Sequence, residues 1–180
     1  MRSSKRSALS RGGAFNFRNR SALANRYTCA RVIVAFVCFG AFGWCAEIAW
    51  TALYEVGEAV LARRTPDLRL SGHTYLWMFP IYGAGGLTFE TVHHALAAWP
   101  WPERGAIYML GCFGVEYASG FVIQLATGKI PWDYSRARWN IHGLIRLDYA
   151  PVWFAFGMML EALERIVVAV TPAVEHVVHS

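Results

Sequence analysis

Four apolar blocks, each long enough to cross a lipid bilayer as a helix, dominate this sequence. A spanning helix takes about 20 residues, and the blocks cover residues 32–54, 75–98, 106–126 and 149–170. Of the 180 residues, 56% are hydrophobic and only 16% are charged, whereas soluble domains carry roughly 25% charged residues. We therefore predict an all-α membrane protein, a bundle of about four transmembrane helices with an amphipathic aromatic loop between the third and the fourth.

The first 31 residues form a basic segment that differs in kind from the apolar blocks. Residues 1–31 contain eight Arg or Lys residues and no acid, which predicts a disordered tail at the cytoplasmic side or against anionic lipid. An organelle transit peptide has a similar composition. No recognition motif accompanies the charge, so we expect no nucleic-acid partner. The membrane domain then covers residues 32–170, and residues 171–180 form a short C-terminal tail.

Charge also bears on the orientation of the chain in the membrane. An even number of spans places both termini on one side, which carries nine Arg or Lys residues against seven on the other side. This balance predicts an integral protein of the inner or plasma membrane with cytoplasmic termini. Without residues 1–25 the balance becomes three against seven, and the orientation reverses.

Each apolar block carries a glutamate well inside it. These are Glu47, Glu90, Glu116 and Glu161. An ionisable side chain at the bilayer centre costs roughly 2.5–3.5 kcal/mol, so we expect the carboxylates to face the bundle interior, where all four could line one polar cavity. The alternative is that each is neutral and hydrogen-bonded for helix packing alone. Glu161 could also pair with Arg165, which lies four residues further along its own helix.

A metal site is the next possibility that the histidines raise. Glu90 begins a Glu-x-x-His unit that ends at His93, and His94 follows. Di-iron bundles use this unit twice, but here it occurs once, and adjacent histidines point to different helix faces. The four cysteines show no metal-binding spacing. We therefore predict neither a metal nor a cofactor.

The segment between the third and fourth blocks combines aromatic and polar residues. Its Trp and Tyr residues favour the membrane interface, and with the loop before the second block it contributes candidate cavity or substrate-binding residues. These candidates are His73, Asp133, Tyr134, Ser135, Asn140 and His142. We expect this loop to pack against the ends of the first and third spans and to cover the shallow end of the cavity. Asp133 could instead cap a turn after Pro131.

Two stretches resemble a known family. They are Gly72-His-Thr-Tyr-Leu-Trp-Met-Phe-Pro-Ile-Tyr-Gly83 and Pro131-Trp-Asp-Tyr-Ser135 followed by Asn140 and Gly143. Over roughly residues 32–165 the chain resembles the transmembrane protein 229 family and bacterial proteins labelled ABC-transporter permeases. The resemblance implies a small multi-pass membrane protein. The permease label would require partner subunits that supply the ATPase.

Two classes of function fit these observations. The first is transport, by a permease-like bundle that passes a small solute or ion through a carboxylate-lined cavity. Such a bundle would act within the lipid bilayer as a homo-oligomer or with partner membrane or ATPase subunits. The second is catalysis, by a lipid-modifying enzyme that uses Asp133, His142 or a buried Glu as acid or base. A structural or assembly factor without chemistry is a third alternative.

Overall fold

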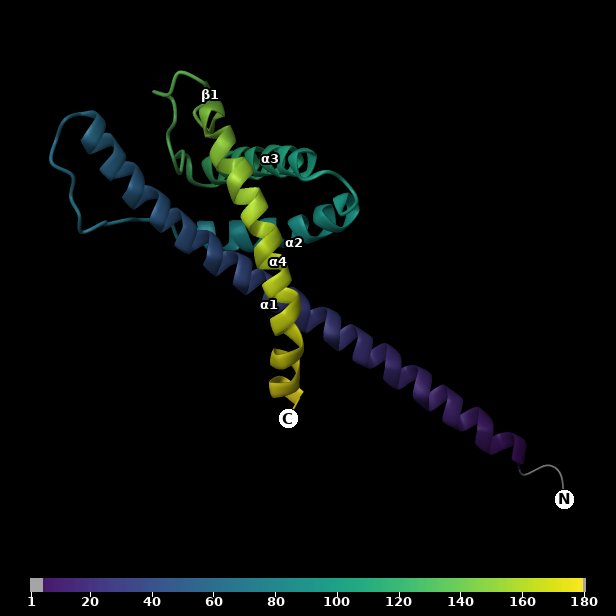
Figure 1. Cartoon of the computed structure of the whole chain (residues 1–180). Helices are drawn as coiled ribbons and strands as arrows, with labels where there is room; N and C mark the ends of the chain where they lie inside the picture. Colours follow the sequence, from purple (N-terminus) through teal and green to yellow (C-terminus); the bar gives the residue numbers. More distant parts are fainter. Residues whose placement is uncertain (1–4, 180) are drawn as a thin grey trace.

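Four helices account for most of the molecule. The computed structural model describes residues 5–179, with the side chains of residues 29–177. The helices are α1 (Lys5–Leu61), α2 (Met78–Leu96), α3 (Trp101–Thr127) and α4 (Ala150–His179). They pack together as a bundle (Figure 1), so the predicted all-α architecture is confirmed.

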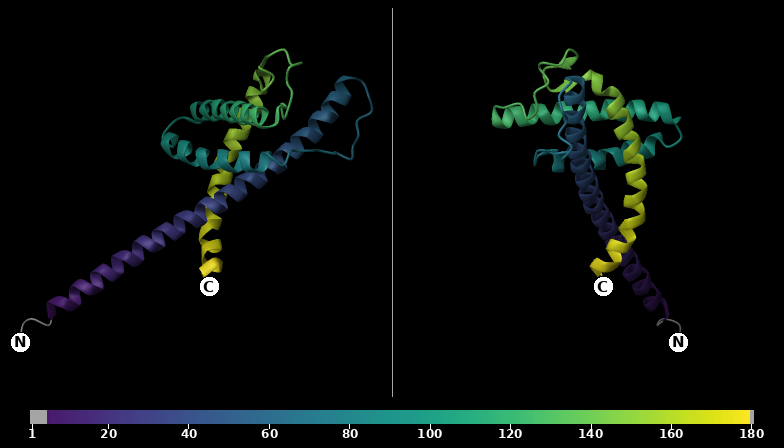
Figure 2. Two further views of the ribbon diagram at one scale, coloured as in Figure 1. Left: turned by 180° about the vertical axis from the view of Figure 1, so that it is seen from behind. Right: turned by 60° about the vertical axis from the view of Figure 1, so that its left-hand side comes forward.

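The first and last helices run in opposite directions and cross, with contacts that lie between Arg31 and Trp50 of α1 (Figures 1 and 2). Phe42 of α1 stacks on Phe156 of α4 with ring centroids 5.9 Å apart. Earlier on α1, Arg31 reaches Glu164, which lies later on α4. Helices α2 and α3 lie across this pair, and the three views agree on this arrangement (Figures 1 and 2). Because α1 and α4 run in opposite directions, the N-terminal part of α1 and the C-terminal part of α4 lie at the same end of the bundle.

Helix α1 continues through most of the basic segment. It begins at Lys5 and contains 57 residues, so the helix passes the predicted boundary at residue 31 without interruption. The segment is rich in Ala and Arg, which favour helix, and it holds no proline to interrupt one. Helix α4 likewise extends to His179, through the residues expected to form a separate C-terminal tail.

The connection from α3 to α4 is a compact hairpin. Strand β1 (Asn140–Ile141) pairs antiparallel with β2 (Ile145–Arg146), and a short 3-10 helix, η1 (Leu147–Tyr149), leads into α4. The turn requires left-handed backbone at His142 and Gly143, with φ of 54° and 70°. Glycine adopts that conformation without steric cost, which makes Gly143 suited to the second of these positions.

Glycines allow α1 and α2 to approach closely. A Cβ atom added at Gly43 would lie 2.1 Å from the Tyr82 ring, and one at Gly86 would lie 2.2 Å from Phe39. Both rings therefore rest directly on the backbone of the opposing helix, as small residues permit in membrane helix pairs. This contact places Tyr82 between the two helices.

Two helical segments are long and apolar enough to cross a membrane. They are Cys29–Leu61 of α1 and the whole of α3. Helix α2 has 19 residues, and α4 carries Glu161, Glu164 and Arg165 within a few residues of one another. The predicted membrane character is thus found in two of the four helices.

The bundle has an apolar core and also exposes many large apolar side chains while it buries several acids. Leu53 and Val122 are 60% and 61% exposed, whereas Glu161 and Glu164 are 3% and 2% exposed. Soluble proteins almost never bury acids fully while exposing large apolar side chains in such number. In lipid the same distribution is favourable, because the outer surface needs no hydration and the polar groups find partners inside.

Candidate functional site

The buried carboxylates form two clusters at different ends of the bundle. Glu47 and Glu116 lie near the hairpin, and we call their surroundings the loop-side cluster. Glu90, Glu161 and Glu164 lie toward the chain termini and form the terminal-side cluster. The two are distinct because their α1 members, Glu47 and Arg31, lie roughly 24 Å apart along the helix at 1.5 Å per residue.

In the loop-side cluster each carboxylate is held by uncharged neighbours. Trp153 of α4 donates its Nε1–H to Oε2 of Glu116 at 3.2 Å, and Tyr134 of the hairpin lies beside the same carboxylate. Glu47 lies beside Thr74 and Tyr82, although its Oε2 is buried with no hydrogen-bond partner. Among residues 29–177, no Lys or Arg forms an ion pair with Glu47 or Glu116.

The hairpin covers this cluster through its aromatic residues. Trp132 donates its Nε1–H to the Leu144 carbonyl at 2.8 Å, and both side chains pack onto Gly120 of α3. Tyr134 makes an edge contact with Tyr149, at 5.9 Å between centroids. Burial, followed by the nearby Glu116 carboxylate, raises the pKa of the Tyr134 hydroxyl, so Tyr134 remains a neutral donor.

The other polar candidates in the loops make contacts that shape the loops. Asp133 is exposed and its Oδ1 accepts the Ser135 amide at 2.9 Å, so it caps a turn, the alternative weighed above. Asn140 donates to the Ala137 carbonyl at 2.7 Å and accepts the Gly143 amide at 3.0 Å.

Both candidate histidines of the loops also contact α-helices from outside. His142 is exposed and lies 2.8 Å from the Tyr117 hydroxyl of α3. His73 joins Thr51 of α1 through its backbone groups, at 2.9 and 3.0 Å. Of the predicted loop residues, Tyr134 reaches Glu116 directly, and His73 lies near enough to Glu47 to act on it electrostatically.

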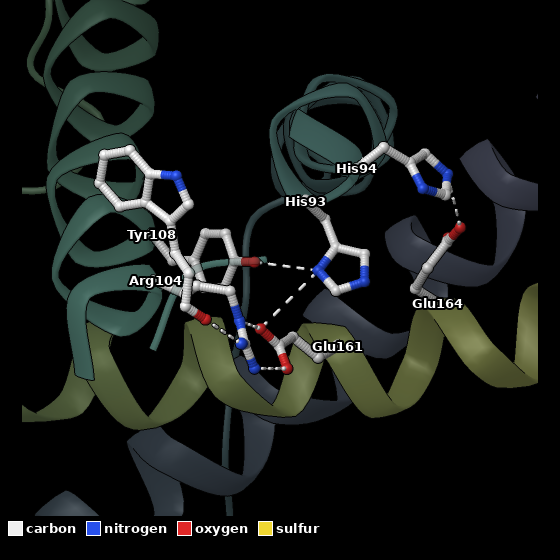
Figure 3. Close-up of polar contacts among 7 residues, drawn as sticks. His93, His94, Arg104, Tyr108, Glu161 and Glu164 are labelled. Atoms are coloured by element: carbon white, nitrogen blue, oxygen red, sulfur yellow. Dashed lines mark hydrogen bonds and ion pairs between the residues drawn. The ribbon is translucent and has the colours of Figure 1, made fainter. Parts of the chain in front are cut away.

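The terminal-side cluster is built around a two-pronged ion pair. Arg104 of α3 donates to both carboxylate oxygens of Glu161, at 2.7 and 3.0 Å, and to the Trp99 carbonyl at 2.6 Å. Nδ1 of His93 lies 2.9 Å from the Tyr108 hydroxyl and 3.7 Å from Glu161 (Figure 3). The partner of Glu161 is thus Arg104 of α3. The alternative partner considered from the sequence was Arg165, which lies on α4 with Glu161.

A second group in this cluster joins α1, α2 and α4. Arg31 donates to Oε1 of Glu164 at 3.0 Å and lies 3.8 Å from Oε2 of Glu90. Nε2 of His94 lies 3.7 Å from Glu164 (Figure 3). One further oxygen on each carboxyl, Oε2 of Glu164 and Oε1 of Glu90, is buried without a hydrogen-bond partner.

The single shared cavity expected for four glutamates is replaced by these two clusters. The antiparallel helices bring Glu47 to Glu116 and bring Glu90 to the end that holds Glu161. Among the described side chains, no three His, Cys, Asp or Glu residues are grouped to hold a metal ion. The two histidines of the Glu-x-x-His unit instead face two different glutamates of α4.

Sequence reasoning missed several residues of the terminal-side cluster. Arg31 and Arg104 were assigned to the tail and to a loop, although both lie inside helices, and Glu164 was counted only as a charge in an uncertain span. One signal was available. Glu161 and Glu164 are three residues apart and therefore share a helix face, which indicates a polar stripe on α4.

Comparison with known proteins places the chain in a family of membrane transport components. A family model described as "Putative ABC-transporter type IV" matches residues 34–179. That range includes every glutamate of both clusters. No solved structure matches the chain.

Proposed function

The chain belongs to this ABC-transporter type IV family, and we propose that it is a membrane-embedded, permease-like component whose interior carboxylates attract a small cation. The proposal is supported by the apolar outer surface of the bundle and by the acids buried inside it. Exposed apolar side chains surround Glu116, Glu161 and Glu164, which are 8%, 3% and 2% exposed. Burying three acids in a four-helix protein costs several kcal/mol per unpaired charge, so a role beyond packing explains their presence.

The loop-side cluster is the better candidate for the cation path. Arg104 pairs with Glu161 at the terminal side, and Arg31 is shared by Glu164 and Glu90. Among the described residues Glu47 and Glu116 form no ion pair with Lys or Arg, although Arg146 lies near enough to act on Glu116. Their two carboxylates are also near enough for each to affect the other. Two acids at short range without an ion-pair partner attract a small cation, which would lower the net negative charge there. Tyr82 and Tyr134 supply further oxygen atoms beside them.

We further propose that partner subunits complete the transporter. The chain contains no G-x-x-x-x-G-K-[ST] motif to bind a nucleotide, so an ABC-type mechanism would need the ATPase from another protein. A second copy of this chain would add spans around the same polar interior. The enzyme alternative gains no support at the hairpin, because Asp133 and His142 are exposed, the first capping a turn and the second bound to Tyr117 of α3.

The test is cation flux in reconstituted vesicles. The full-length chain in liposomes should carry a small monovalent cation such as K⁺ or methylammonium down an imposed gradient, above the rate in empty liposomes. Glu116→Gln should reduce this flux, because it removes one of the two acids without an ion-pair partner. Glu103→Gln, at the exposed start of α3, is the matched control and should not. Flux that is equal in wild type and Glu116→Gln, or absent with and without co-purified subunits, would refute the proposal.

A further inference from the structure

Two buried carboxyl groups in the terminal-side cluster share a single counter-ion. Glu90 comes from α2, Glu164 from α4, and Arg31 of α1 lies 3.8 and 3.0 Å from them. Glu164 is 2% exposed, and its Oε2 reaches no hydrogen-bond donor. The Oε1 atom of Glu90 is buried without a partner as well. The group therefore lacks one positive charge and at least one donor.

The surrounding charges do not supply what is missing. On α3, Arg104 is bound by both oxygens of Glu161 and lies in a pair that is neutral by itself. On α2, His93 contacts Tyr108 and Glu161. On α4, Arg165 is exposed. His94 is the remaining titratable neighbour, and its Nε2 is 3.7 Å from Glu164.

A single proton satisfies both requirements. We propose that Glu90 and Glu164 form a proton-binding site in which the two carboxyls share one proton beside Arg31. The proton cancels the excess negative charge, and the O–H that it forms donates to the facing carboxylate. The two carboxyls lie near enough for a side-chain hydrogen bond between them. Paired carboxyls at this range bind one proton because both cannot remain ionised in a low-dielectric site.

His94 provides the route between this site and water. Its side chain is 64% exposed, whereas that of Glu164 is 3% exposed, so the ring lies between solvent and the buried pair. For uptake, the ring closes the 3.7 Å gap to Glu164 and the imidazolium gives the proton on Nε2 to the vacant Oε2 of that carboxylate. The ring is left neutral with its remaining proton on Nδ1. Release runs in reverse, with Nε2 accepting the proton from Glu164.

The site makes the proton a candidate coupling ion for the proposed transporter, and that coupling role rests on the proposed function. Proton loss would leave Glu90 and Glu164 both charged against one guanidinium, and their repulsion would act between α2 and α4. The binding of the proton itself can be tested without any flux.

Infrared difference spectroscopy on the full chain in detergent detects a protonated carboxyl by its carbonyl stretch. The Glu47→Gln, Glu116→Gln double variant serves as the background, because it removes the loop-side carboxyls from the spectrum. In that background we expect such a band at neutral pH, and its loss on adding Glu90→Gln or Glu164→Gln, because the remaining carboxylate then pairs alone with Arg31 and ionises. Glu103→Gln should keep the band. A band that survives both single substitutions would overturn the proposal. Loss of the band of that background on adding NaCl at constant pH would also overturn it, in favour of a metal-cation site.

Two further measurements guard against variants that merely fold poorly. The wild-type melting temperature should fall as the pH rises through deprotonation of the pair, because the folded state then loses a bound proton. Glu90→Gln should abolish that dependence while it keeps a cooperative transition. His94→Gln should keep the band but slow its hydrogen–deuterium exchange by roughly 100-fold, the scale of a lost acid–base group. Unchanged exchange would remove His94 from the route. If these results are obtained and the liposome flux assay fails, the proton-binding site is supported and the proposed transport function is refuted.

Discussion

The two carboxylate clusters use different means to keep acids inside the bundle. At the terminal side, Arg31 and Arg104 reach inward from α1 and α3 and meet Glu164 and Glu161 with charge. At the loop side, Glu116 is met by the indole N–H of Trp153 and by hairpin aromatics. In the first arrangement Glu161 has an arginine of its own, and Glu90 and Glu164 share Arg31. In the second, no Lys or Arg of the described part of the chain forms an ion pair with either carboxylate. The terminal-side cluster is therefore suited to joining helices and binding a proton, and the loop-side cluster to receiving an external cation.

The position of each cluster explains the difference. Arg104 lies in the first turn of α3 and Arg31 lies at the start of the apolar part of α1, so both guanidinium groups can enter from a membrane boundary. Long basic side chains behave in this way near helix ends. The loop-side acids lie instead beneath a hairpin that closes that end with Trp132 and Leu144.

The largest expected effect comes from breaking the terminal-side ion pair. Arg104→Gln would leave Glu161, which is 3% exposed, without its two charged hydrogen bonds. Removing one partner of a buried pair costs about 3–5 kcal/mol. Unfolding in mixed micelles with increasing denaturing detergent measures this loss. Arg136→Gln, in the exposed hairpin, is the matched control, and an equal loss in both variants would contradict the role of the pair.

Adding Glu161→Gln to Arg104→Gln sharpens the same comparison. The double variant removes the stranded charge, so it should recover a large part of the lost unfolding free energy, and the interaction energy of the cycle should exceed about 1 kcal/mol. Additive losses would mean that the two side chains act independently.

A smaller loss is expected where α1 and α2 touch beside the loop-side cluster. Gly43→Ala would put a Cβ atom 2.1 Å from the Tyr82 ring, and overpacking of this kind costs about 1–3 kcal/mol. Gly57→Ala, on the same helix, meets nothing within 4 Å and should be neutral or stabilise by up to about 1 kcal/mol. The melting temperatures of the two variants should therefore move in different directions.

A still smaller effect is expected from the hydroxyl that the hairpin sends to Glu116. Tyr134→Phe keeps the ring and removes the donor, which should lower the unfolding free energy by about 1 kcal/mol. The same variant should alter cation flux in liposomes, because the environment of Glu116 changes. Tyr75→Phe, whose ring is 45% exposed, should change neither quantity.

The smallest effect concerns the turn at Asp133. Its hydrogen bonds to Ser135 lower the pKa of the Asp133 carboxyl, so the contact is present at neutral pH and is lost as the pH falls through that lowered value. Hydrogen exchange at the Ser135 amide should thus accelerate only in acid. Asp133→Asn keeps an acceptor oxygen and should show no acid-dependent acceleration. If the Ser135 amide of the wild type exchanges at the rate of an unprotected amide at every pH, the turn is contradicted.

Much of the helical architecture was predictable from composition and spacing. The all-α bundle and the inward position of Glu116 and Glu161 follow from the cost of charge in an apolar setting. Element ends were less predictable. The basic segment lacks the apolar residues that signal a packed helix, yet α1 begins at Lys5. Helix propensity and the helical block that follows account for this early start.

The division into two clusters could not be predicted from one helix at a time. Depth along each block was estimated from uncertain span ends, and errors of one or two turns decide whether Glu90 meets Glu47 or Arg31. The hairpin was expected as a cover, and Tyr134 does face a buried acid. Asp133 does not face a buried acid. Its carboxylate accepts the amide of the residue two positions further along and so closes a turn, which is a common local preference of aspartate.

The length of α1 has a mechanical consequence. Its 57 residues run without proline, so the helix has no built-in kink between Arg31 in one cluster and Glu47 in the other. A push or twist applied at its basic end is carried along a stiff rod, and both residues shift together. Strain introduced at one end of the molecule is therefore felt at the other without any chain of side-chain rearrangements between them.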